Sequence, residues 1–291
     1  MWWLLVLALA TAAVGASPHE AVHSFTGANP DVHNLVIATT TDSMLDLTRN
    51  MLCSLAAVSD DSFGVLLAVM DGSCDSYALL VADFPFVCAE LPIGIPVSKT
   101  DVDYHRKEYW DVNHKRFAIV TDMFHQAKAS GLAFVLHTDV DIVFLRSPFH
   151  LDLSSAPVHF LSDNGVPNGG FYYVNLKETN MALFECAKTN LANGRTSDGG
   201  DQGAIAAALE TGDYPYAFLS PAIALNGRAL FTIGPTTASV AGHANWIFNS
   251  REKIKCLMRS HLWYHDDGVC YRPRAFKLPS ISGQHGPFTC L

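Results

Sequence analysis

The chain has 291 residues, of which 49% are hydrophobic and 16% are charged, and its formal net charge is −9 at pH 7. This composition is typical of a globular protein with one large α/β domain, and two small domains are the second option. The acidic chain has no long basic run and so lacks the electrostatic footprint of a protein that binds nucleic acid or anionic membranes. An anionic substrate would need local help from a metal ion and a few basic side chains.

The chain begins with an apolar segment, MWWLLVLALATAAVGA, that ends in small residues. Its end, Val14-Gly15-Ala16, resembles a signal-peptidase site, and the segment is short for a bilayer span and lacks basic flanking residues. We expect residues 1–16 to be a cleaved secretory signal, with a short signal anchor as the alternative. Either arrangement places the rest of the chain in an oxidising compartment.

Seven cysteines occur, at positions 53, 74, 88, 186, 256, 270 and 290. In an oxidising compartment we expect some of them to form disulfides. An odd number leaves at least one thiol free or bonded to another chain. No C-x-x-C pair occurs, so a thiolate zinc site is not expected, and the sequence does not determine which cysteines pair.

We expect residues 17–33 to be a polar, poorly ordered lead-in, after which strands alternate with helices. Asp42 or Ser43 can cap the first helix of the domain. This alternation indicates a parallel, Rossmann-like sheet, and no G-x-G-x-x-G opens the first helix, so a dinucleotide cofactor is not indicated. The predicted elements are a strand at Asn34–Thr41, a helix at Met44–Val58, a strand at Phe63–Met70, a strand–helix unit within Tyr77–Cys88, a connector at Leu91–Val97, and a helix at Trp110–Ser130 closed by Gly131.

The stretch Leu132–His150, LAFVLHTDVDIVFLRSPFH, is the predicted centre of the fold. Apolar runs on both sides of Asp139 and Asp141 are typical of a strand buried on both faces of a mostly parallel sheet. Two carboxylates there would cost roughly several kcal/mol each without compensation. They lie two residues apart, so on an extended strand both point the same way.

A divalent cation is the expected compensation, because ligands of open α/β sheets bind at the carboxyl ends of the strands. Carboxylates suit Mg²⁺ or Mn²⁺, which in turn prefer phosphate oxygens, so the stretch predicts a site for a metal-bound diphosphate. A D-x-D motif alone is weak evidence, and a second copy occurs at Asp101-Val102-Asp103. That copy lies in a polar stretch with no strand around it, and we interpret it as a solvated turn.

Beyond the centre, two glycines in Asn168-Gly169-Gly170 allow a close backbone approach before a β-rich run. A polar, glycine-rich loop at Asn193–Gly200 leads to Asp201-Gln202 at the start of a helix. The remaining predicted elements are a strand at Val158–Leu161, helices at Lys177–Leu191 and 202–210, short strands at Ala217–Leu219 and Phe231–Ile233, and a helix with a loop-rich tail over 251–291.

Four features in a fixed order carry a family resemblance: Asp139-x-Asp141, Asn168-Gly169-Gly170, Asp201-Gln202 and His243-Ala244-Asn245-Trp246. Together they resemble the nucleotide-diphospho-sugar transferase family, GT-A-fold glycosyltransferases typified by plant arabinosyl- and xylosyltransferases. The resemblance covers about Asn34 to Leu257. Arg146-Ser147-Pro148 resembles the family's R-D-P, with Ser147 replacing the Asp, and we assign Ser147 no chemistry.

The resemblance implies an α/β fold of the GT-A, Rossmann-like class, with a mixed, mostly parallel sheet flanked by helices. One transferase domain with a loop-rich carboxyl-terminal tail would then cover residues 34–291. It also implies that the reaction retains the configuration of the anomeric carbon. Whether an enzyme nucleophile or same-face attack accomplishes this is open.

The resemblance further implies roles for individual residues. Asp139 would contact the metal or the ribose of the sugar nucleotide, Asp141 would coordinate the metal, and His243 would complete its shell. Asp201 and Gln202 would lie beside the donor sugar. The loop formed by Asn168, Gly169 and Gly170 would line the sugar and acceptor side.

Elementary chemistry is consistent with these roles. Cleavage at the anomeric carbon leaves negative charge on the diphosphate, which a divalent metal stabilises as a Lewis acid. Lys115, Arg116 and Lys253 are the candidate basic side chains that would add to this. The sugar becomes oxocarbenium-like, so an oxygen of Asp201 or Gln202 nearby would stabilise its positive charge.

Each of these features has a purely structural alternative. Asp139 and Asp141 could be solvated carboxylates of a turn, and Asp201 could be the amino-terminal cap of its helix, worth about 1 kcal/mol. His243 could be a core histidine beside Trp246. The two glycines could form only a tight turn, and Lys115 and Arg116 could belong to a solvated helix face.

We therefore expect a metal-dependent glycosyltransferase of the secretory pathway, in the Golgi lumen, secreted or anchored by its amino terminus. It would move a sugar from a nucleotide sugar, expected to be a UDP-sugar, to a glycan or glycoprotein acceptor with Mn²⁺ or Mg²⁺. No nucleic-acid partner is expected. Membrane contact is expected only through an amino-terminal anchor. Two alternatives remain: a metal-dependent diphosphate hydrolase, and a non-catalytic glycan-binding module of the same fold.

Overall fold

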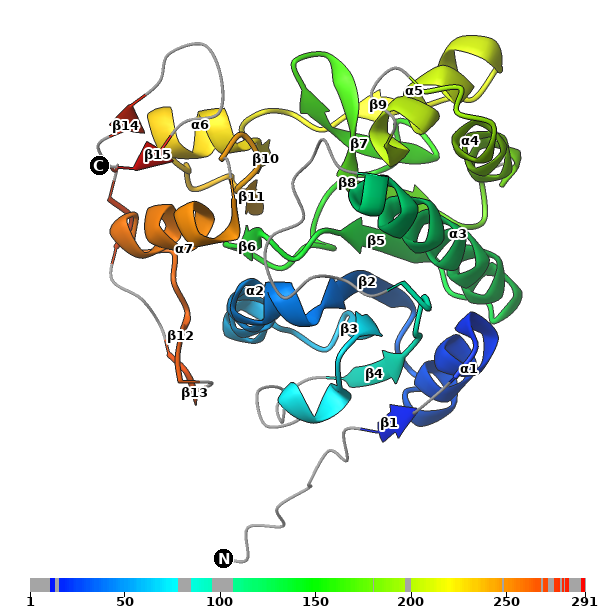
Figure 1. Ribbon diagram of the computed structural model, residues 1–291, viewed down its shortest axis with the longest axis horizontal. Helices are drawn as coiled ribbons and strands as arrows, with labels where there is room; N and C mark the ends of the chain where they lie inside the picture. Colours follow the sequence, from blue (N-terminus) through cyan, green and yellow to red (C-terminus); the bar gives the residue numbers. More distant parts are fainter. Residues whose placement is uncertain are drawn as a thin grey trace, which may run out of the picture.

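A twisted eight-stranded sheet forms the centre of the protein in the computed structural model (Figure 1). The residues described are 11–13, 16–77, 85–95, 107–179, 181–196, 200–247, 249–267, 269–271, 275–277, 279, 281–282 and 289–290. The second D-x-D copy at 101–103 lies outside them, as do most of the predicted strand–helix unit at 77–88 and the end of the 91–97 connector.

The large sheet is mixed and mostly parallel, as expected. Strands β4, β3, β2 and β5 run parallel to one another, and β8 then pairs antiparallel with both β5 and β7. In spatial order the strands are β1 (Thr11–Ala13), β4 (Phe86–Glu90), β3 (Gly64–Asp71), β2 (Asn34–Thr41), β5 (Phe134–Thr138), β8 (Val166–Asn175), β7 (Val158–Asp163) and β9 (Ala217–Phe218).

Alternate residues of each strand enter two separate cores, one on each face of the sheet. On β2, Leu35 and Ile37 join one core, whereas Val36 and Ala38 join the other. Because side chains of a strand alternate in direction, an unbroken apolar run is what a sheet covered on both faces requires. The helices of the first core are α1 (Pro18–Ala28), α3 (Lys107–Ala129), α4 (Ala182–Ala192) and α5 (Asp201–Thr211).

The second core contains α2 (Leu45–Val58) and a smaller unit that Figure 1 shows on the left of the view. In this unit β11 (Ala241–His243) pairs parallel with β10 (Ala224–Leu225) and antiparallel with β6 (Ile142–Phe144). Helices α6 (Gly227–Thr232) and α7 (Ser250–Arg259) also belong to it. The hairpins β12–β13 (His265–Asp266, Val269–Cys270) and β14–β15 (Ile281–Ser282, Thr289–Cys290) form the tail.

Three expectations for local structure were wrong. The segment 17–33 is not a disordered lead-in: it contains α1, whose Ala21, Val22 and Phe25 are fully buried and whose first turn is closed by a capping box of Ser17 and Glu20. Residues 231–233 belong to the end of α6 rather than to a strand. Neither predicted cap residue caps α2, because 42–44 form a short 3₁₀ turn before it.

Three disulfides join Cys53 to Cys270, Cys74 to Cys88 and Cys256 to Cys290, and Cys186 is a free thiol. The expectation that some of the seven cysteines pair and that at least one stays free is confirmed. Within the described residues, no helix has the length and apolar character needed to cross a bilayer.

Candidate functional site

The D-x-D motif lies where the chain passes from the large sheet to the small one. Strand β5 ends at Thr138 and β6 begins at Ile142, so Asp139 to Asp141 form the link. The Asp139 amide donates to the Gly170 carbonyl of β8 at 2.7 Å, and the Asp141 carbonyl accepts from the Ala244 amide at 2.8 Å. The expectation of one continuous strand was therefore wrong, although the motif does follow the carboxyl end of a central parallel strand.

His243 brings a third potential ligand to the two carboxylates. It is the last residue of β11, whose antiparallel pairing places it opposite Ile142. Its Nε2 lies 3.0 Å from Asp141 Oδ1 and 3.7 Å from Asp139 Oδ2. One ligand atom from each of the three residues lies within 4.8 Å of the others, a distance that one ion can bridge.

The cluster fits a divalent metal. Two carboxylates and one imidazole are side chains that ligate divalent cations. Gly170 leaves the necessary room, because a Cβ there would overlap the Asp139 carboxylate and lie 3.0 Å from His243 Cε1. The backbone of β8 thus approaches the carboxylates as closely as only a glycine allows.

Lys253 of α7 compensates the buried charge of Asp141, with Nζ 2.7 Å from Asp141 Oδ2. Burial favours the neutral acid, but the Lys253 and His243 charges and hydrogen bonds outweigh it, so the pKa of Asp141 lies well below its usual range. Burial disfavours the imidazolium of His243, but Asp141 and Asp139 outweigh it and raise the pKa of His243. Asp141 is therefore ionised and acceptor-only, as a metal ligand must be.

Arg116 of α3 ties the motif to the start of α5. Its guanidinium donates to Asp139 Oδ1 at 2.8 Å and to Asp201 Oδ2, and its side chain is only 15% exposed. The alternative that Arg116 belongs to a solvated helix face is wrong, because its guanidinium pairs with two carboxylates and its side chain is largely buried. Counted formally, Asp139, Asp141 and Asp201 against Arg116 and Lys253 leave one negative charge.

Asp201 does not cap α5. The cap position is Gly200, with no side-chain hydrogen bond, and the Asp201 carboxylate pairs with Arg116 through Oδ2 while Oδ1 accepts from the Gln202 amide at 2.9 Å. Next to it, Gln202 Oε1 accepts from Asn168 Nδ2 at 3.3 Å and from the Gly169 amide at 3.4 Å. A Cβ at Gly169 would lie 2.9 Å from Asp201 Oδ1.

The Asn168-Gly169-Gly170 segment belongs to strand β8 and is not the predicted loop. The strand contacts Asp139, Asp201 and Gln202. Of the predicted residues, the structure brings together Asp139, Asp141, Asn168, Gly169, Gly170, Asp201, Gln202, His243, Arg116 and Lys253. Lys115 points elsewhere among the described residues: its ammonium donates to the carbonyl of Ile93.

Two buried polar residues under this site were missed by the sequence reasoning. His137 precedes the motif on β5 and pairs in register with Tyr172 of β8, with ring centroids 5.0 Å apart. Burial and the positive charge of Arg116 lower the pKa of His137 to about 4, so the imidazole is neutral. The sequence signal that could have identified them is a polar side chain, such as His137, within an otherwise apolar predicted strand.

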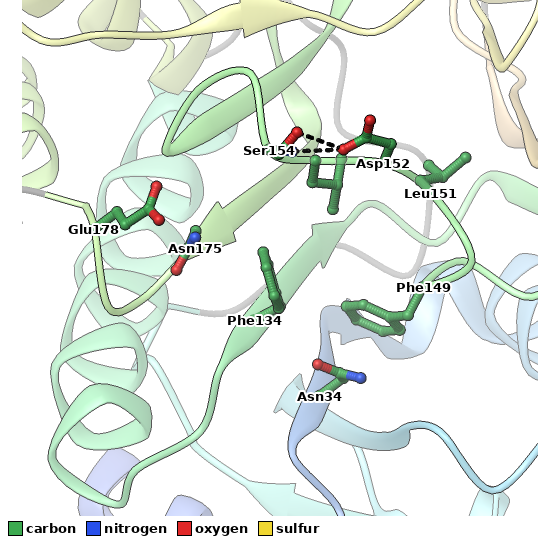
Figure 2. Close-up of a pocket in the computed structure, with 9 residues that line it drawn as sticks. Asn34, Phe134, Phe149, Leu151, Asp152, Ser154, Asn175 and Glu178 are labelled. Carbon is green, nitrogen blue, oxygen red and sulfur yellow. Dashed lines mark hydrogen bonds between the residues drawn. The ribbon is translucent and has the colours of Figure 1, made fainter.

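A separate pocket of about 400 Å³ lies at the amino-terminal ends of the central parallel strands (Figure 2). Its lining includes Asn34 and Phe134, the first residues of β2 and β5, together with Asn175 at the end of β8. Parallel strands β2 and β5 therefore separate this pocket from the carboxylate cluster at their other end. The two sites are distinct.

Comparison with known proteins places this geometry in a family. A family model for nucleotide-diphospho-sugar transferases matches residues 65–257. A structure of the galactosyltransferase LgtC in complex with donor and acceptor sugar analogs is 13% identical, covers 72% of this chain and 87% of that chain, and has a TM-score of 0.49. An active-site mutant of LgtC is 12% identical, with the same coverage and a TM-score of 0.50.

The likeness to the second of these structures concerns the fold alone, which is GT-A as expected. A search of the curated proteins found no match. The family model, by contrast, covers well over half of the 291 residues and includes every residue of the carboxylate cluster. The chain therefore belongs to the nucleotide-diphospho-sugar transferase family and is a glycosyltransferase.

Proposed function

We propose that this protein transfers a sugar from a UDP-sugar to a glycan or glycoprotein acceptor, with retention of configuration and with Mn²⁺ or Mg²⁺ as cofactor. The observation that carries the proposal is the cluster of Asp139, Asp141 and His243, whose ligand atoms lie within 4.8 Å of one another. It stands at the carboxyl end of β5, where open α/β sheets bind their ligands.

The charges of the site suit an anionic donor. Asp139, Asp141, Asp201, Arg116 and Lys253 together carry one net negative charge, so a divalent ion added to them gives one positive charge, which attracts a diphosphate. When bound, the metal would supply Lewis-acid stabilisation of the departing diphosphate. In this proposal the Lys253 ammonium, which is already bonded to Asp141, also contributes positive potential at the diphosphate.

The sugar side of the site is held by α5 and β8. Arg116 bonds to the carboxylates of both Asp201 and Asp139, so the three side chains hold one another in place. Gln202 is held through Oε1 by Asn168 and Gly169, which sets the position of its amide beside the two glycines. In this proposal Asp201 and Gln202 lie beside the donor sugar, and the negative potential of their oxygens stabilises the positive charge that develops at the anomeric carbon.

The compartment is also part of the proposal. Three disulfides hint at an oxidising environment, and the apolar start of the chain is consistent with entry into the secretory pathway and the Golgi lumen. Peptide mapping without reduction tests this: protein recovered from the secretory pathway should contain the Cys53–Cys270 peptide pair. Recovery of all seven cysteines as thiols from cells would contradict it.

Calorimetric titration with UDP is the first test of the site. With Mn²⁺ present, we expect micromolar binding, equivalent to about −8 kcal/mol, and no binding after excess EDTA. Asp141→Asn and His243→Ala should lose the metal-dependent part. Asp152→Asn, an acidic residue of the pocket at the far edge, and His150→Ala, an exposed histidine, are matched controls that should bind like the wild type.

Three results would each revise the proposal. UDP binding that EDTA does not weaken would remove the cluster from donor binding, and binding of GDP in place of UDP would correct the donor nucleotide. If UDP-sugars were cleaved at the same rate with and without every acceptor tried, the reaction would be hydrolysis. The anomeric proton coupling of the product, measured by NMR, tests retention.

A further inference from the structure

Trp246 has a backbone conformation that its side chain disfavours. Its φ is 66°, in the left-handed region that glycine populates and that a bulky residue seldom adopts. The residue ends the His243-Ala244-Asn245-Trp246 segment, to which the carboxylate cluster gives a role only at His243. A strained backbone persists only where its surroundings hold it, and such positions gather at ligand sites.

Three neighbours hold the Trp246 side chain in place. Its Nε1 donates to Asp163 Oδ1 at 2.6 Å, and the Arg228 guanidinium lies over the ring, 5.5 Å from the centroid. The preceding residue is also fixed, because the Gly227 amide donates to Asn245 Oδ1 at 2.6 Å. A Cβ at Gly227 would overlap the Asn245 carbonyl, so this close approach needs glycine.

These contacts place the indole beside the proposed reaction site. Trp246 follows His243 by three residues, so their Cα atoms are at most about 11 Å apart. Asp163 ends β7, and the hairpin it forms with β8 continues to Asn168 and Gly169, which contact Gln202. One hairpin therefore joins the indole to a residue proposed to lie beside the donor sugar.

The indole is only partly buried, and it packs against the second core while Arg228 covers part of the ring. A large aromatic surface, fixed in orientation and left partly accessible beside a transferase site, is suited to the apolar C–H face of a sugar ring. Fixing the ring in advance lowers the entropy cost of binding. The polar edge at Nε1 is already used by Asp163, so a ligand would contact the part of the ring that neither Arg228 nor the core covers.

We propose that Trp246 is the platform on which the ring of the acceptor sugar stacks. The inference rests on the proposed function, since it names a substrate subsite of the same transferase. It makes Trp246 a specificity-determining residue for the acceptor. Asp163 and Arg228 act through Trp246 and are positioning residues.

Saturation-transfer NMR tests the contact without requiring turnover. Methyl glycosides of glucose, galactose, xylose and arabinose serve as probes, with UDP and Mn²⁺ in the sample. With the wild type, the ring protons of at least one glycoside should receive saturation. Trp246→Gly, which removes the indole and suits the positive φ, should reduce that transfer at least fivefold, and Trp246→Phe should retain about half.

Two controls keep the result interpretable. Asp267 also has a positive φ, of 44°, but lies in the β12–β13 turn, so Asp267→Gly should leave the saturation transfer unchanged. Melting temperatures show whether each variant folds, and Asp163→Ala offers a second way to release the indole, with an expected loss of transfer.

The two proposals fail in different ways. Equal saturation transfer with the wild type and Trp246→Gly would overturn the acceptor platform, as would the absence of transfer to all four glycosides. Failure of UDP and Mn²⁺ to bind, read by calorimetry on the same sample, would instead overturn the proposed function. In a transfer assay the acceptor KM of Trp246→Gly should rise at least tenfold, whereas an equal fall in kcat at unchanged acceptor KM would argue for a structural role.

Discussion

At the scale of single residues, the site depends on charges that are buried together. Asp141 is almost fully enclosed, yet it is ionised because Lys253 and His243 each approach one of its oxygens. Removing either partner would leave an uncompensated buried charge, which costs more than the pair contributes as a whole. The three side chains therefore form one unit, and they come from the link after β5, from β11 and from α7.

His137 leads to a prediction for stability against pH. Its pKa is about 4 in the folded protein against an ordinary 6.5, so the unfolded chain takes up the proton first as the pH falls. The stability due to the neutral imidazole is complete above pH 6.5 and is lost as the pH falls towards 4. The shift corresponds to about 3 kcal/mol.

Urea unfolding of the wild type and His137→Gln in EDTA, between pH 7 and pH 4, measures this contribution. The wild type should lose about 3 kcal/mol more than the variant over that range. His33→Gln, which changes an exposed histidine before β2, should follow the wild type. Parallel curves for the wild type and His137→Gln would show that His137 is not buried in its neutral form.

At the scale of elements, the β7–β8 hairpin organises the site. Strand β8 bonds to β5 beside the D-x-D motif, presents Gly169 to Asp201 and Gly170 to Asp139, and receives the amide oxygen of Gln202. Two glycines in a strand interior weaken it slightly, and here they allow carboxylates to approach the backbone. The two glycines therefore serve the site, although they slightly destabilise the strand.

Gly170→Ala should impair binding at the site more than it destabilises the fold. The added methyl overlaps the Asp139 carboxylate and crowds His243, so we expect at least a tenfold loss of Mn²⁺-dependent UDP binding. Overpacking should also lower the free energy of unfolding by about 1–3 kcal/mol. Calorimetry and urea unfolding measure the two effects.

Gly27→Ala is the matched control, because Gly27 lies in α1 and a Cβ there meets no atom within 4 Å. It should stabilise the protein by about 0.4–1 kcal/mol and leave UDP binding as in the wild type. If Gly170→Ala bound UDP with unchanged affinity, the close approach of β8 to the carboxylates would have no role in donor binding.

At the scale of the whole molecule, disulfides secure the smaller unit and the tail to the large sheet. Cys53 lies in α2 and Cys270 in β13, 217 residues later, whereas Cys256 of α7 pairs with Cys290 of β15. One disulfide starts from α7, the helix that contains Lys253, and another from α2, which contacts β6, the strand that follows Asp141. The position of the tail is thus fixed by cross-links more than by its short strands.

Removing the long-range disulfide should cost the most stability. In the chain-entropy account, closing a loop of 217 residues is worth about 5 kcal/mol and one of 14 residues about 3 kcal/mol. Urea unfolding should therefore rank Cys53→Ser/Cys270→Ser below Cys74→Ser/Cys88→Ser. Cys186→Ser, which changes the free thiol, should unfold close to the wild type. The reverse order of the two double variants would contradict the entropic explanation.

The sequence by itself determined the class of the fold and most members of the site. The β-rich run Asn34–Thr41, with Leu35–Ala38 as its apolar part, coincides with the strand observed, because burial on both faces favours this pattern. Charged residues within such runs, as at Asp139 and Asp141, marked a site because a buried carboxylate needs compensation. The family resemblance added Asp201, Gln202 and His243, which no local pattern distinguishes.

Only the tertiary structure decided how these residues act on one another. Arg116 has the local sequence of a helix surface, and it is the packing of α3 that turns it towards Asp139 and Asp201. The lead-in at 17–33 and the strand at 231–233 were misjudged because local propensity is weaker than tertiary contact. Pairings over long separations, such as Lys253 with Asp141 and Cys53 with Cys270, depend on the path of the whole chain, which no window of sequence contains.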